Sequence, residues 1–386
     1  MPRILHLIAS DSLGGPEKQL LHHARDTRAA GYQIILGSFQ ESAHAPEFLT
    51  LARRHGIETV SIPGGVRPGL VDDVAQYLRG HAIDLVCTHG YKANVVGHFA
   101  ARNVKVPAVP FVHGFSGESW QVTLYERLER SLLVRSPWVV CTSPAQAREL
   151  GRLRRGRRAP LVIPNAVLAP REVERMRGFC PSREELGYNG RSFVFGAAGR
   201  FSREKGHRYL LDAFSMLLKM EPDQPMELLL LGEGREEATL RAQARRLGIE
   251  SRVCFAGFQS RPALWMKVMN CVVHPSTAEG TSSTILEAML LGIPVIGTAA
   301  GGTEDLIDDG ETGLLVKPES AAALAEAMKE ILDSPALCRH MAEKAQDYVE
   351  QNFSPARQRS LLEMMYGSLL QPIFAHLPQE SVDVVA

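Results

Sequence analysis

The stretch HPSTAEGTSSTILEAMLLGIPVIGTAAGG, residues 274–302, is the part of the sequence that decides the fold. The apolar run CVVHPS predicts a buried strand that ends near His274, and TILEAMLLG predicts the helix that follows it. Gly292 and Pro294 are residues that typically end a helix. A buried strand that leads through a loop into a helix is typical of α/β proteins with a parallel sheet.

Two carboxylates lie around the start of this helix. We expect Glu279 in the loop between strand and helix, and Glu287 eight residues later in the first turn of the helix. The N–H groups at a helix N-terminus favour phosphate oxygens, and carboxylates there can accept hydrogen bonds from sugar hydroxyls. A second interpretation stays open, because Thr284 and Glu287 also fit a capping box in which the glutamate binds only the backbone.

The composition excludes several classes of protein. At 386 residues the chain has room for two ordinary domains, and its 43 Lys and Arg equal its 43 Asp and Glu, which argues against a nucleic-acid-binding protein. Its six cysteines show no CxxC spacing, as expected for reduced thiols in a cytoplasmic protein. The opening MPRILHLIAS predicts a first strand and not a signal peptide, and no apolar run reaches about 18 residues.

Short apolar runs alternate with helical patterns along the chain, which predicts two doubly wound parallel sheets. A charged segment with proline and glycine, 171–192, separates the two series. We therefore expect an N-terminal domain over 1–170, a linker over 171–192 and a second domain over 193–355. Ligand crevices in such sheets lie at the carboxyl ends of the strands, so the two domains should face each other across one cleft.

The loop after the first strand of the second domain contains two different cations. In GAAGRFSREKGHRYLLDAF, Arg200 follows the strand and Lys205 precedes Gly206. A planar guanidinium fork and a compact ammonium group together suit a diphosphate. The alternative is an ordinary solvated basic loop, since charged residues in loops are mostly exposed.

A glycine pair, Gly14 and Gly15, follows the first strand and would let the backbone approach a ligand closely. The GxGxxG pattern of dinucleotide-binding folds is absent, which weakens a dehydrogenase interpretation. Two histidines, His89 and His113, each follow an apolar strand and are candidates to face the cleft. His89, with Lys92 three residues later, is a candidate for the acceptor side. A structural role for these histidines stays equally open.

Eight motifs, in order and over nearly the whole chain, make the sequence resemble the retaining GT-B glycosyltransferases of family 4, also called glycosyl transferases group 1. They are GG at 14–15, HG at 113–114, VIPNAV at 162–167, GRFSREKG at 199–206, LLGEG at 230–234, FAGF at 255–258, the two glutamates and AGGTED at 300–305. The resemblance implies two Rossmann-like domains that face an interdomain cleft. It also implies a C-terminal helix, about 356–386, that crosses back to the N-terminal domain.

The resemblance assigns roles to individual residues. Arg200 and Lys205 would bind the donor diphosphate, Glu279 the transferred sugar, and Glu287 the ribose. His113 would contact the donor sugar near the reacting carbon, so His113, Arg200, Lys205 and Glu279 are the catalytic candidates. The other donor-site candidates are Gly14, Gly15, Gly280, Ser283, Thr284 and Ile285, of which the last three would act through backbone amides at the helix start.

Two positions depart from the family pattern. Ser12 stands where the glycine loop usually opens with glycine, and Thr281 and Ser282 replace a Phe–Gly pair that many members carry. The second change suggests a different donor-sugar preference. No DxD sequence is present, so we expect a reaction without metal or cofactor, in which Arg200, Lys205 and the helix dipole meet the charge on the leaving diphosphate.

The expected function is transfer of a sugar from a UDP-sugar, or from GDP-mannose, to a hydroxyl of a glycan or a lipid-linked acceptor. The setting implied by the resemblance is bacterial cell-surface polysaccharide or lipopolysaccharide synthesis. Two alternatives stay open on the same fold. One is a nucleotide-sugar epimerase or hydrolase, and the other is a non-catalytic protein that binds sugar nucleotides.

A cluster of arginines in RELGRLRRGRR suggests a membrane partner. Anionic lipid headgroups attract such clusters, and the apolar residues at helical spacing in 119–136 would offer a companion surface, which would place the protein peripherally on the cytoplasmic face of the inner membrane. A solvated loop and an ordinary core helix are the alternative. The arginines are Arg148, Arg152, Arg154, Arg155, Arg157 and Arg158.

Overall fold

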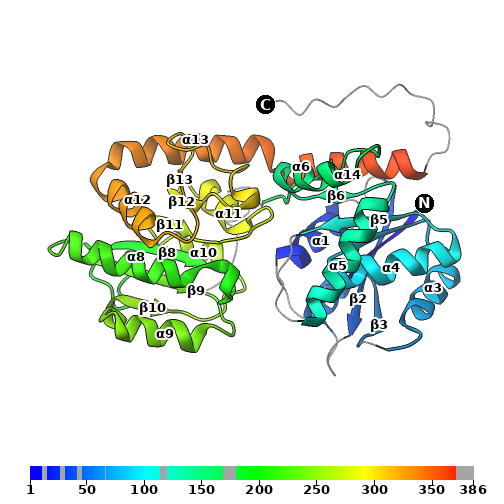
Figure 1. Ribbon diagram of the computed structural model, residues 1–386, viewed down its shortest axis with the longest axis horizontal. Coiled ribbons are helices and arrows are strands. Elements are labelled where there is room, and N and C mark those ends of the chain that lie inside the picture. The colour runs from blue at the N-terminus through cyan, green and yellow to red at the C-terminus, as the bar shows by residue number, and fades with distance from the viewer. Residues whose placement is uncertain are drawn as a thin grey trace. The chain divides into compact units, whose positions relative to one another are not determined.

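The computed structural model describes residues 1–10, 15–26, 31–40, 46–65, 67–113, 120–167 and 180–370. Contacts divide the chain into two compact units, Met1–Phe111 with Ala356–Ala386, and Val112–Pro355. The helices and strands of each unit are drawn in Figure 1. The first unit is shorter than the N-terminal domain expected over 1–170, because contacts group the segment after Phe111 with the second unit.

The first sheet has seven strands in the order β3-β2-β1-β4-β5-β6-β7, and its described strand pairs are parallel. The strands are β1 (Arg3–Ile8), β2 (Gln33–Gln40), β3 (Glu58–Pro63), β4 (Leu85–His89), β5 (Ala108–Val112), β6 (Val140–Cys141) and β7 (Leu161–Val162). The helices in this part of the chain are α1 (Gly15–Asp26), α2 (Glu47–Arg54), α3 (Leu70–Gly80), α4 (Tyr91–Val104), α5 (Trp120–Arg135) and α6 (Pro144–Leu153).

Strand β1 shows how the first unit is layered. Leu5 and Leu7 pack in a core with residues of α3 and α4. Because successive side chains of a strand point to opposite faces, His6 lies on the other face, where it meets Tyr366 of α14 (Pro355–Leu370), the last helix in the described part of the chain. The C-terminal helix therefore returns to the N-terminal unit, as expected.

The second sheet has six strands in the order β10-β9-β8-β11-β12-β13, again with parallel pairs. The strands are β8 (Phe193–Ala198), β9 (Met226–Leu231), β10 (Val253–Phe255), β11 (Cys271–His274), β12 (Val295–Thr298) and β13 (Leu314–Val316). The helices are α8 (His207–Met220), α9 (Glu237–Arg246), α10 (Pro262–Met266), α11 (Ser283–Leu290), α12 (Ala321–Asp333) and α13 (Pro335–Asn352).

Both faces of the second sheet are buried, which confirms a doubly wound domain. Phe195 and Val273 point into a core with α8, α9 and α12, whereas Val194 and Val272 point into a core with α11 and α13. Such two-sided burial explains why these strands are continuous apolar runs and do not alternate with polar residues. The arrangement of helices around the strands is visible in Figure 1.

The elements predicted around residues 274–302 are present. Strand β11 ends at His274, and α11 ends at Leu290, just before Gly292 at φ +66°. The described part of the expected linker, 180–192, forms turns that pack on the second unit: Tyr188 is buried in its core, and Arg183 donates to the Val268 carbonyl at 3.0 Å.

Each sheet has one point where the strand order changes direction. In the first sheet β1 is followed by β2 on one side while β4 lies on the other, and in the second sheet β8 has the same position between β9 and β11. Open α/β sheets bind ligands outside the carboxyl ends of the strands at such switch points. The two switch points, β1/β4 and β8/β11, are therefore where functional side chains are expected.

Candidate functional site

The loop that carries Arg200 is held by the loop after β9. The N–H of Phe201 donates to the Glu233 carbonyl at 2.8 Å. A Cβ at Gly234 would lie 2.4 Å from the Phe201 carbonyl oxygen, so only glycine lets the two backbones come this close. The LLGEG motif thus fixes the backbone on both sides of Arg200.

The loop after β8 also touches the loop after β11. The Thr277 N–H donates to the Glu204 carbonyl at 2.7 Å, and a Cβ at Gly206 would lie 2.0 Å from the Pro275 carbonyl oxygen. Gly206 also has a φ of +67°, which favours glycine. Backbone contact therefore brings Lys205 to the loop that carries the first glutamate.

A third loop, which contains the 3₁₀ turn η4 (Gly301–Thr303), also contacts the backbone of Glu279. The N–H of Gly302 donates to the Glu279 carbonyl at 3.1 Å. A Cβ at Gly302 would lie 1.9 Å from the Gly280 carbonyl oxygen. The backbone of Glu279 and Gly280 is thus held between the loop after β8 and the AGGTED motif.

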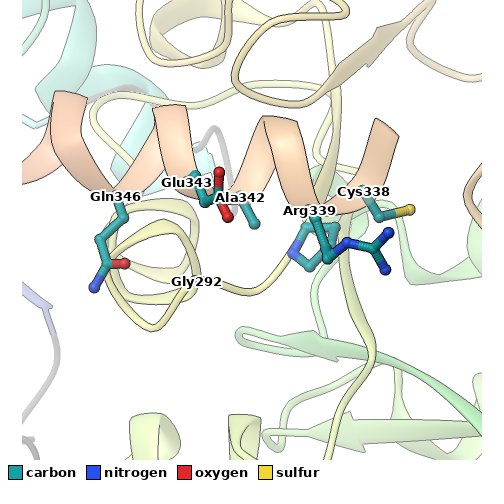
Figure 2. Close-up of a pocket in the computed structure, with 7 residues that line it drawn as sticks. Gly292, Cys338, Arg339, Ala342, Glu343 and Gln346 are labelled. Atoms are coloured by element: carbon teal, nitrogen blue, oxygen red, sulfur yellow. The ribbon is translucent and has the colours of Figure 1, made fainter. Parts of the chain in front are cut away.

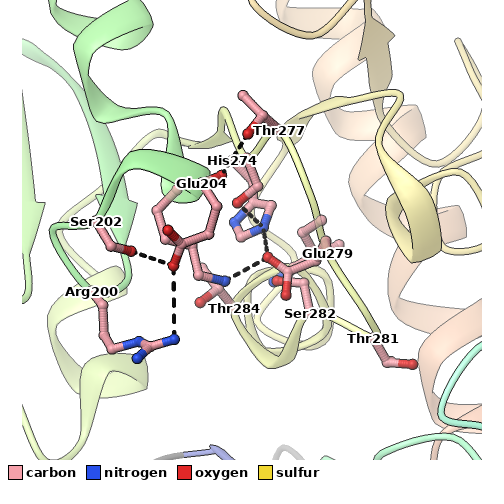
Figure 3. A network of polar contacts seen from close by, with 12 residues as sticks. Arg200, Ser202, Glu204, His274, Thr277, Glu279, Thr281, Ser282 and Thr284 are labelled. Carbon is pink, nitrogen blue, oxygen red and sulfur yellow. Dashed lines mark hydrogen bonds and ion pairs between the residues drawn. The ribbon is translucent and has the colours of Figure 1, made fainter. Parts of the chain in front are cut away.

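These loops bring together a charged cluster at the β8/β11 switch point. Lys205 Nζ lies 2.6 Å from Glu279 Oε2, and His274 Nε2 lies 2.9 Å from the same oxygen. Ser276 Oγ lies 3.0 Å from His274 Nε2. Figure 3 shows the ring of His274 turned toward the Glu279 carboxylate. We call Lys205, Glu279, His274 and Ser276 the switch-point cluster.

The cluster keeps the Glu279 carboxylate ionised. Burial alone raises the pKa of Glu279, but the charge of Lys205 and the hydrogen bonds from His274 and Lys205 outweigh burial and hold the pKa well below its usual range. Because an ionised carboxylate can only accept hydrogen bonds, Nε2 of His274 must carry a proton. Glu279 is therefore suited to accept hydrogen bonds from a ligand and not to donate a proton to one.

Arg200 differs from Lys205 in its surroundings. Its side chain is 66% exposed, and its Nη2 is 3.8 Å from Glu204 Oε1, a distance at which a solvent-exposed ion pair contributes little. Ser202 Oγ donates to the same Glu204 oxygen at 2.5 Å (Figure 3). Arg200 thus presents an accessible guanidinium beside the switch-point cluster.

The helix start differs from the expected capping box. Ser282, not Thr284, is the N-cap, and its Oγ accepts from the Ile285 N–H at 3.4 Å. Thr284 lies inside the helix, and its hydroxyl donates to the Ala198 carbonyl at 3.1 Å. The capping-box interpretation is therefore wrong, and so is the placement of Glu287 in the first turn, because α11 starts at Ser283 and Glu287 is its fifth residue.

The cap changes which amides of α11 remain for a ligand. The N–H of Ile285 is bonded to Ser282, which leaves Ser283 and Thr284 to supply the first N–H groups that have no partner within the helix. Both residues are partly exposed. The helix N-terminus can therefore offer two of the three expected amides to a phosphate group.

His113 follows β5 and lies next to this loop within the same unit. A Cβ at Gly280 would be 2.9 Å from the His113 carbonyl oxygen. Burial lowers the pKa of His113 to about 4, so its imidazole is neutral at pH 7. Thr281 donates to the Thr142 carbonyl and Ser282 caps α11, so both side chains at the position proposed for sugar choice have structural roles.

The candidates of the first unit lie at the β1/β4 switch point. Gly15 is the first residue of α1, while Gly14 and Ser12 lie outside the described residues. His89 ends β4 and is buried. Lys92 is 7% exposed, and its Nζ donates to the Gly65 carbonyl at 3.0 Å, so it is engaged in the structure of its own unit.

The arginine cluster is only partly a surface feature. Arg148 and Arg152 lie on α6, and Arg148 pairs with Asp305 at 2.8 Å. Arg154 is 2% exposed and donates to the carbonyls of Leu133, Ser136 and Arg158, which excludes it from a lipid-binding surface. The guanidinium of Arg158 lies 3.6 Å from the centre of the Trp138 ring. Arg154 is thus the one buried arginine of the six, and the exposed ones besides Arg148 and Arg158 are Arg152, Arg155 and Arg157.

A shallow pocket of about 290 Å³ in the second unit lies away from this chemistry. Figure 2 shows it between Gly292 and the α13 side chains Arg339, Glu343 and Gln346. Gly292 precedes β12, so the pocket is at the amino end of that strand, opposite the carboxyl end where Glu279 lies. It has no role in the candidate site.

Two further properties concern metals and membranes. Within the described ranges, no group of three or more His, Cys, Asp or Glu residues is arranged to hold a metal ion. No described helix is both long enough and apolar enough to cross a membrane.

Two members of the switch-point cluster, His274 and Ser276, were not among the predicted site residues. The available signal was the end of β11: a histidine and a serine there lie five and three residues before Glu279. The sequence could place His274 at the strand end, but not its ring nitrogen on the carboxylate. That contact depends on the loop geometry imposed by Gly206, Gly301 and Gly302.

Comparisons with known proteins agree with this arrangement. The family description "Glycosyl transferases group 1" matches residues 181–348, and "Glycosyl transferase 4-like domain" matches residues 14–166. The structure of Anabaena Alr3699/HepE in complex with UDP-glucose has a TM-score of 0.80 and 28% identity, over 95% of this chain and 100% of that one.

Two sequence relatives are similarly distant. The D-inositol 3-phosphate glycosyltransferase of Arthrobacter sp. (strain FB24) is 28% identical over 312 residues, which are 76% of this chain and 72% of that protein. The putative glycosyltransferase EpsD of Bacillus subtilis (strain 168) is 28% identical over 203 residues. That match spans 53% of this chain and about half, 51%, of EpsD.

Proposed function

Because the chain belongs to the glycosyl transferases group 1 family, we propose that it transfers a sugar from a nucleoside diphosphate sugar to a hydroxyl group of an acceptor. The observation that carries the proposal is the switch-point cluster, in which Lys205 and His274 hold an ionised Glu279 beside the exposed Arg200. In this proposal the donor site lies in residues 193–355 and the acceptor side in residues 1–170, joined by 171–192.

Lys205 would bind the diphosphate without leaving Glu279. An ammonium group has three donors, so one can stay on Oε2 at 2.6 Å while the others meet phosphate oxygens. Arg200 would add a planar fork to the same diphosphate. The Ser283 and Thr284 amides and the positive end of the α11 dipole would meet the remaining phosphate charge.

Glu279 would hold the transferred sugar by accepting hydrogen bonds from its hydroxyls. A carboxylate has about four lone-pair sites, so the bonds from Lys205 and His274 leave capacity for a ligand. The same two bonds make Glu279 a weak nucleophile. This supports a retaining reaction through an oxocarbenium-like state, in which the departing phosphate helps to deprotonate the acceptor and no covalent sugar–enzyme intermediate forms.

The proposed donor is a UDP-sugar, because the similar Anabaena protein binds UDP-glucose. The test is thermal stabilisation of the full chain by UDP, GDP, UDP-glucose and GDP-mannose, since a ligand that binds only the folded state raises its stability. We expect stabilisation by the uridine compounds and its loss in Lys205→Ala, with the exposed Lys219→Ala as the matched control. Stabilisation only by guanosine compounds would mean that the donor is a GDP-sugar and not a UDP-sugar. Stabilisation by none of the four compounds would refute the proposal.

Release of free sugar would identify a different reaction. Transfer to a glycan or lipid-linked acceptor consumes the UDP-sugar only when the acceptor is present. A hydrolase or an epimerase acts on the donor alone. Turnover of UDP-glucose at the same rate with and without an acceptor panel would therefore contradict transfer.

We also propose that the acceptor is presented at an anionic lipid surface. Helix α5 exposes apolar side chains and buries charged ones, the reverse of an ordinary amphipathic helix. Leu124 and Leu128 are 51% and 47% exposed, while Glu126 and Glu129 are buried. Leu153, at the end of α6, is 58% exposed. Exposed leucines combined with the accessible arginines Arg152, Arg155 and Arg157 fit the boundary between anionic headgroups and acyl chains.

Sedimentation with lipid vesicles tests this surface. We expect binding to vesicles that contain phosphatidylglycerol, weaker binding at high salt, and loss of binding in Leu124→Ser/Leu128→Ser. The control is Met216→Ser/Met220→Ser, which removes two exposed apolar side chains from α8. Absence of vesicle binding at low salt, or equal loss in both double variants, would contradict the membrane proposal.

A further inference from the structure

A chain of buried hydrogen bonds lies at the β1/β4 switch point. His6 Nδ1 is 2.9 Å from His89 Nε2, His6 Nε2 is 2.8 Å from Tyr366 Oη, and His23 Nε2 is 2.6 Å from the same hydroxyl. The four side chains are 0–5% exposed and come from β1, β4, α1 and α14. We call them the histidine–tyrosine chain.

The rings are also packed against each other. The rings of His6 and His89 meet edge to edge at their hydrogen bond, with centres 5.1 Å apart and planes 23° apart, and His89 stacks on Phe111 at 4.5 Å. Phe111 thus covers one face of the His89 ring, and the hydrogen bond to His6 holds its edge. These two contacts restrict rotation of the imidazole, so we consider which of its nitrogens carries the proton.

The protons in the chain cannot be placed independently. Burial lowers the pKa of His6 far below its usual value and that of His23 to about 3, so both rings are neutral, and burial keeps Tyr366 protonated by raising its pKa. A neutral imidazole has one N–H donor and one acceptor nitrogen, and a hydroxyl has one proton. Tyr366 must therefore donate to one histidine and accept from the other.

Two proton arrangements satisfy these three hydrogen bonds. In the first, His23 Nε2–H donates to Tyr366, Tyr366 donates to His6 Nε2, and His6 Nδ1–H donates to His89 Nε2. In the second, each donor and acceptor is exchanged. A neutral His89 carries its proton on Nδ1 in the first arrangement and on Nε2 in the second, so its state is tied to a hydroxyl on the last helix of the chain.

We propose that Tyr366 and His6 are positioning residues that couple the protonated ring nitrogen of His89 to the direction of the hydrogen bonds of Tyr366. This deepens the proposed function and rests on it for the place of His89 on the acceptor side. The position of this proton decides whether the other ring nitrogen, Nδ1, acts as a hydrogen-bond donor or as an acceptor. One tautomer throughout the population would give a single mode of contact with the acceptor.

The experiment is nitrogen NMR of the full chain with ¹⁵N-labelled histidine, because the shifts of the two ring nitrogens report the tautomer. We expect the wild type to show one of two sets: protons on Nδ1 of His89, Nδ1 of His6 and Nε2 of His23, or on the three opposite nitrogens. A mixed set, or a charged ring at pH 7 at any of the three, would overturn the proposal.

Substitution tests the coupling. In Tyr366→Phe we expect the tautomer signals of His6 and His89 to change or to average, and in Tyr32→Phe, a phenol whose ring packs 5.3 Å from that of Tyr366, we expect the wild-type set. Unchanged tautomers in Tyr366→Phe would overturn the proposal. If that variant does not fold, His23→Leu serves instead, because Tyr366 must then donate to His6 and the Nδ1–H form of His89 becomes the expected one.

UDP binding separates this proposal from the proposed function. Calorimetry with UDP probes residues of the other unit, so we expect Tyr366→Phe to bind UDP as the wild type does. Wild-type protein that shows the expected tautomer set but does not bind UDP would contradict the donor proposal alone. UDP binding together with uncoupled histidines would contradict the positioning role alone.

Discussion

The two switch points of this molecule occupy equivalent places in two similar sheets, but one is lined by charged side chains and the other by uncharged ones. At β8/β11, Lys205 and the ionised Glu279 form a charged cluster. At β1/β4, the neutral rings of His6 and His23 are joined through the hydroxyl of Tyr366 by hydrogen bonds. A site that holds a diphosphate needs charge, whereas a site that holds an uncharged sugar hydroxyl needs oriented donors and acceptors. In the proposed function, the same topology would therefore suit two different ligands through a few side chains.

The largest effect is expected from a substitution that disrupts the charged switch point. Lys205→Ala removes a cation from the diphosphate and leaves the buried carboxylate of Glu279 without its closest partner. We expect the rate of sugar transfer to fall about 100- to 1,000-fold, as when a donor to a transition-state oxyanion is removed. The measurement is transfer from UDP-glucose to the best acceptor of a panel. A Lys205→Ala variant with turnover close to that of Lys219→Ala would contradict the role of the cluster.

The next effect concerns the stability of the uncharged switch point. Tyr366→Phe removes one hydroxyl that serves two buried histidine nitrogens, and each buried polar atom left unsatisfied costs about 1–3 kcal/mol. We expect a loss of about 3 kcal/mol in the free energy of unfolding in urea. Tyr32→Phe is the control and should cost far less. Equal losses in the two variants would mean that the hydrogen bonds of Tyr366 do not stabilise the unit.

The pH dependence of stability should distinguish the two switch points. His23 has a pKa of about 3 in the folded chain and about 6.5 when unfolded, so the unfolded chain binds a proton first as the pH falls. Its neutral burial therefore destabilises the fold below about pH 6.5, by roughly 2 kcal/mol at pH 5. Glu279 has the opposite sign, because its lowered pKa stabilises the fold above about pH 4.3 and this stabilisation is lost only in stronger acid.

Urea unfolding between pH 7 and pH 5 measures this difference. Stability should fall across this range in the wild type, and the fall should be smaller by roughly 2 kcal/mol in His23→Gln. His55→Gln, which alters an exposed histidine, should keep the wild-type slope. A His23→Gln variant with an unchanged slope would show that this imidazole is not buried in its neutral form.

The smallest effect concerns the helix that supports the charged switch point. Ser282→Ala removes the N-cap of α11 and should cost about 1 kcal/mol. Ser320→Ala removes the equivalent cap of α12, whose Oγ accepts from Ala323 N–H at 3.2 Å, and should cost a similar amount. Only Ser282→Ala should also weaken UDP binding in calorimetry, because α11 is the helix that faces the phosphates in the proposed complex. Equal UDP affinity in both variants would show that the N-cap of α11 does not contribute to donor binding.

Much of the second unit could be predicted from the sequence because its signals are local. The strand that ends at His274, the loop that holds Glu279 and the end of α11 before Gly292 all follow from residues within a short window. The first residue of α11 was harder to predict from the sequence. Ser282, Ser283 and Thr284 are all good caps, and only the observed bond from Ser282 Oγ to the Ile285 N–H decides among them.

Features that depend on distant parts of the chain could not be predicted. Arg154 looks like one more surface arginine in the sequence, yet it is buried because the carbonyls of Leu133 and Ser136 accept its guanidinium. The partner of His6 in the last helix is 360 residues away. No pattern of residue types within either segment indicates that the two meet, so the histidine–tyrosine chain becomes visible only in the folded molecule.

The return of α14 to the first unit has a consequence for how the protein is made. Tyr366 leaves the ribosome 343 residues after His23, so the first unit cannot complete its buried polar contacts until the second unit has been synthesised. Domains usually fold in the order in which they are translated. Here the second unit can acquire its own core first, and the unit that is begun first is completed last.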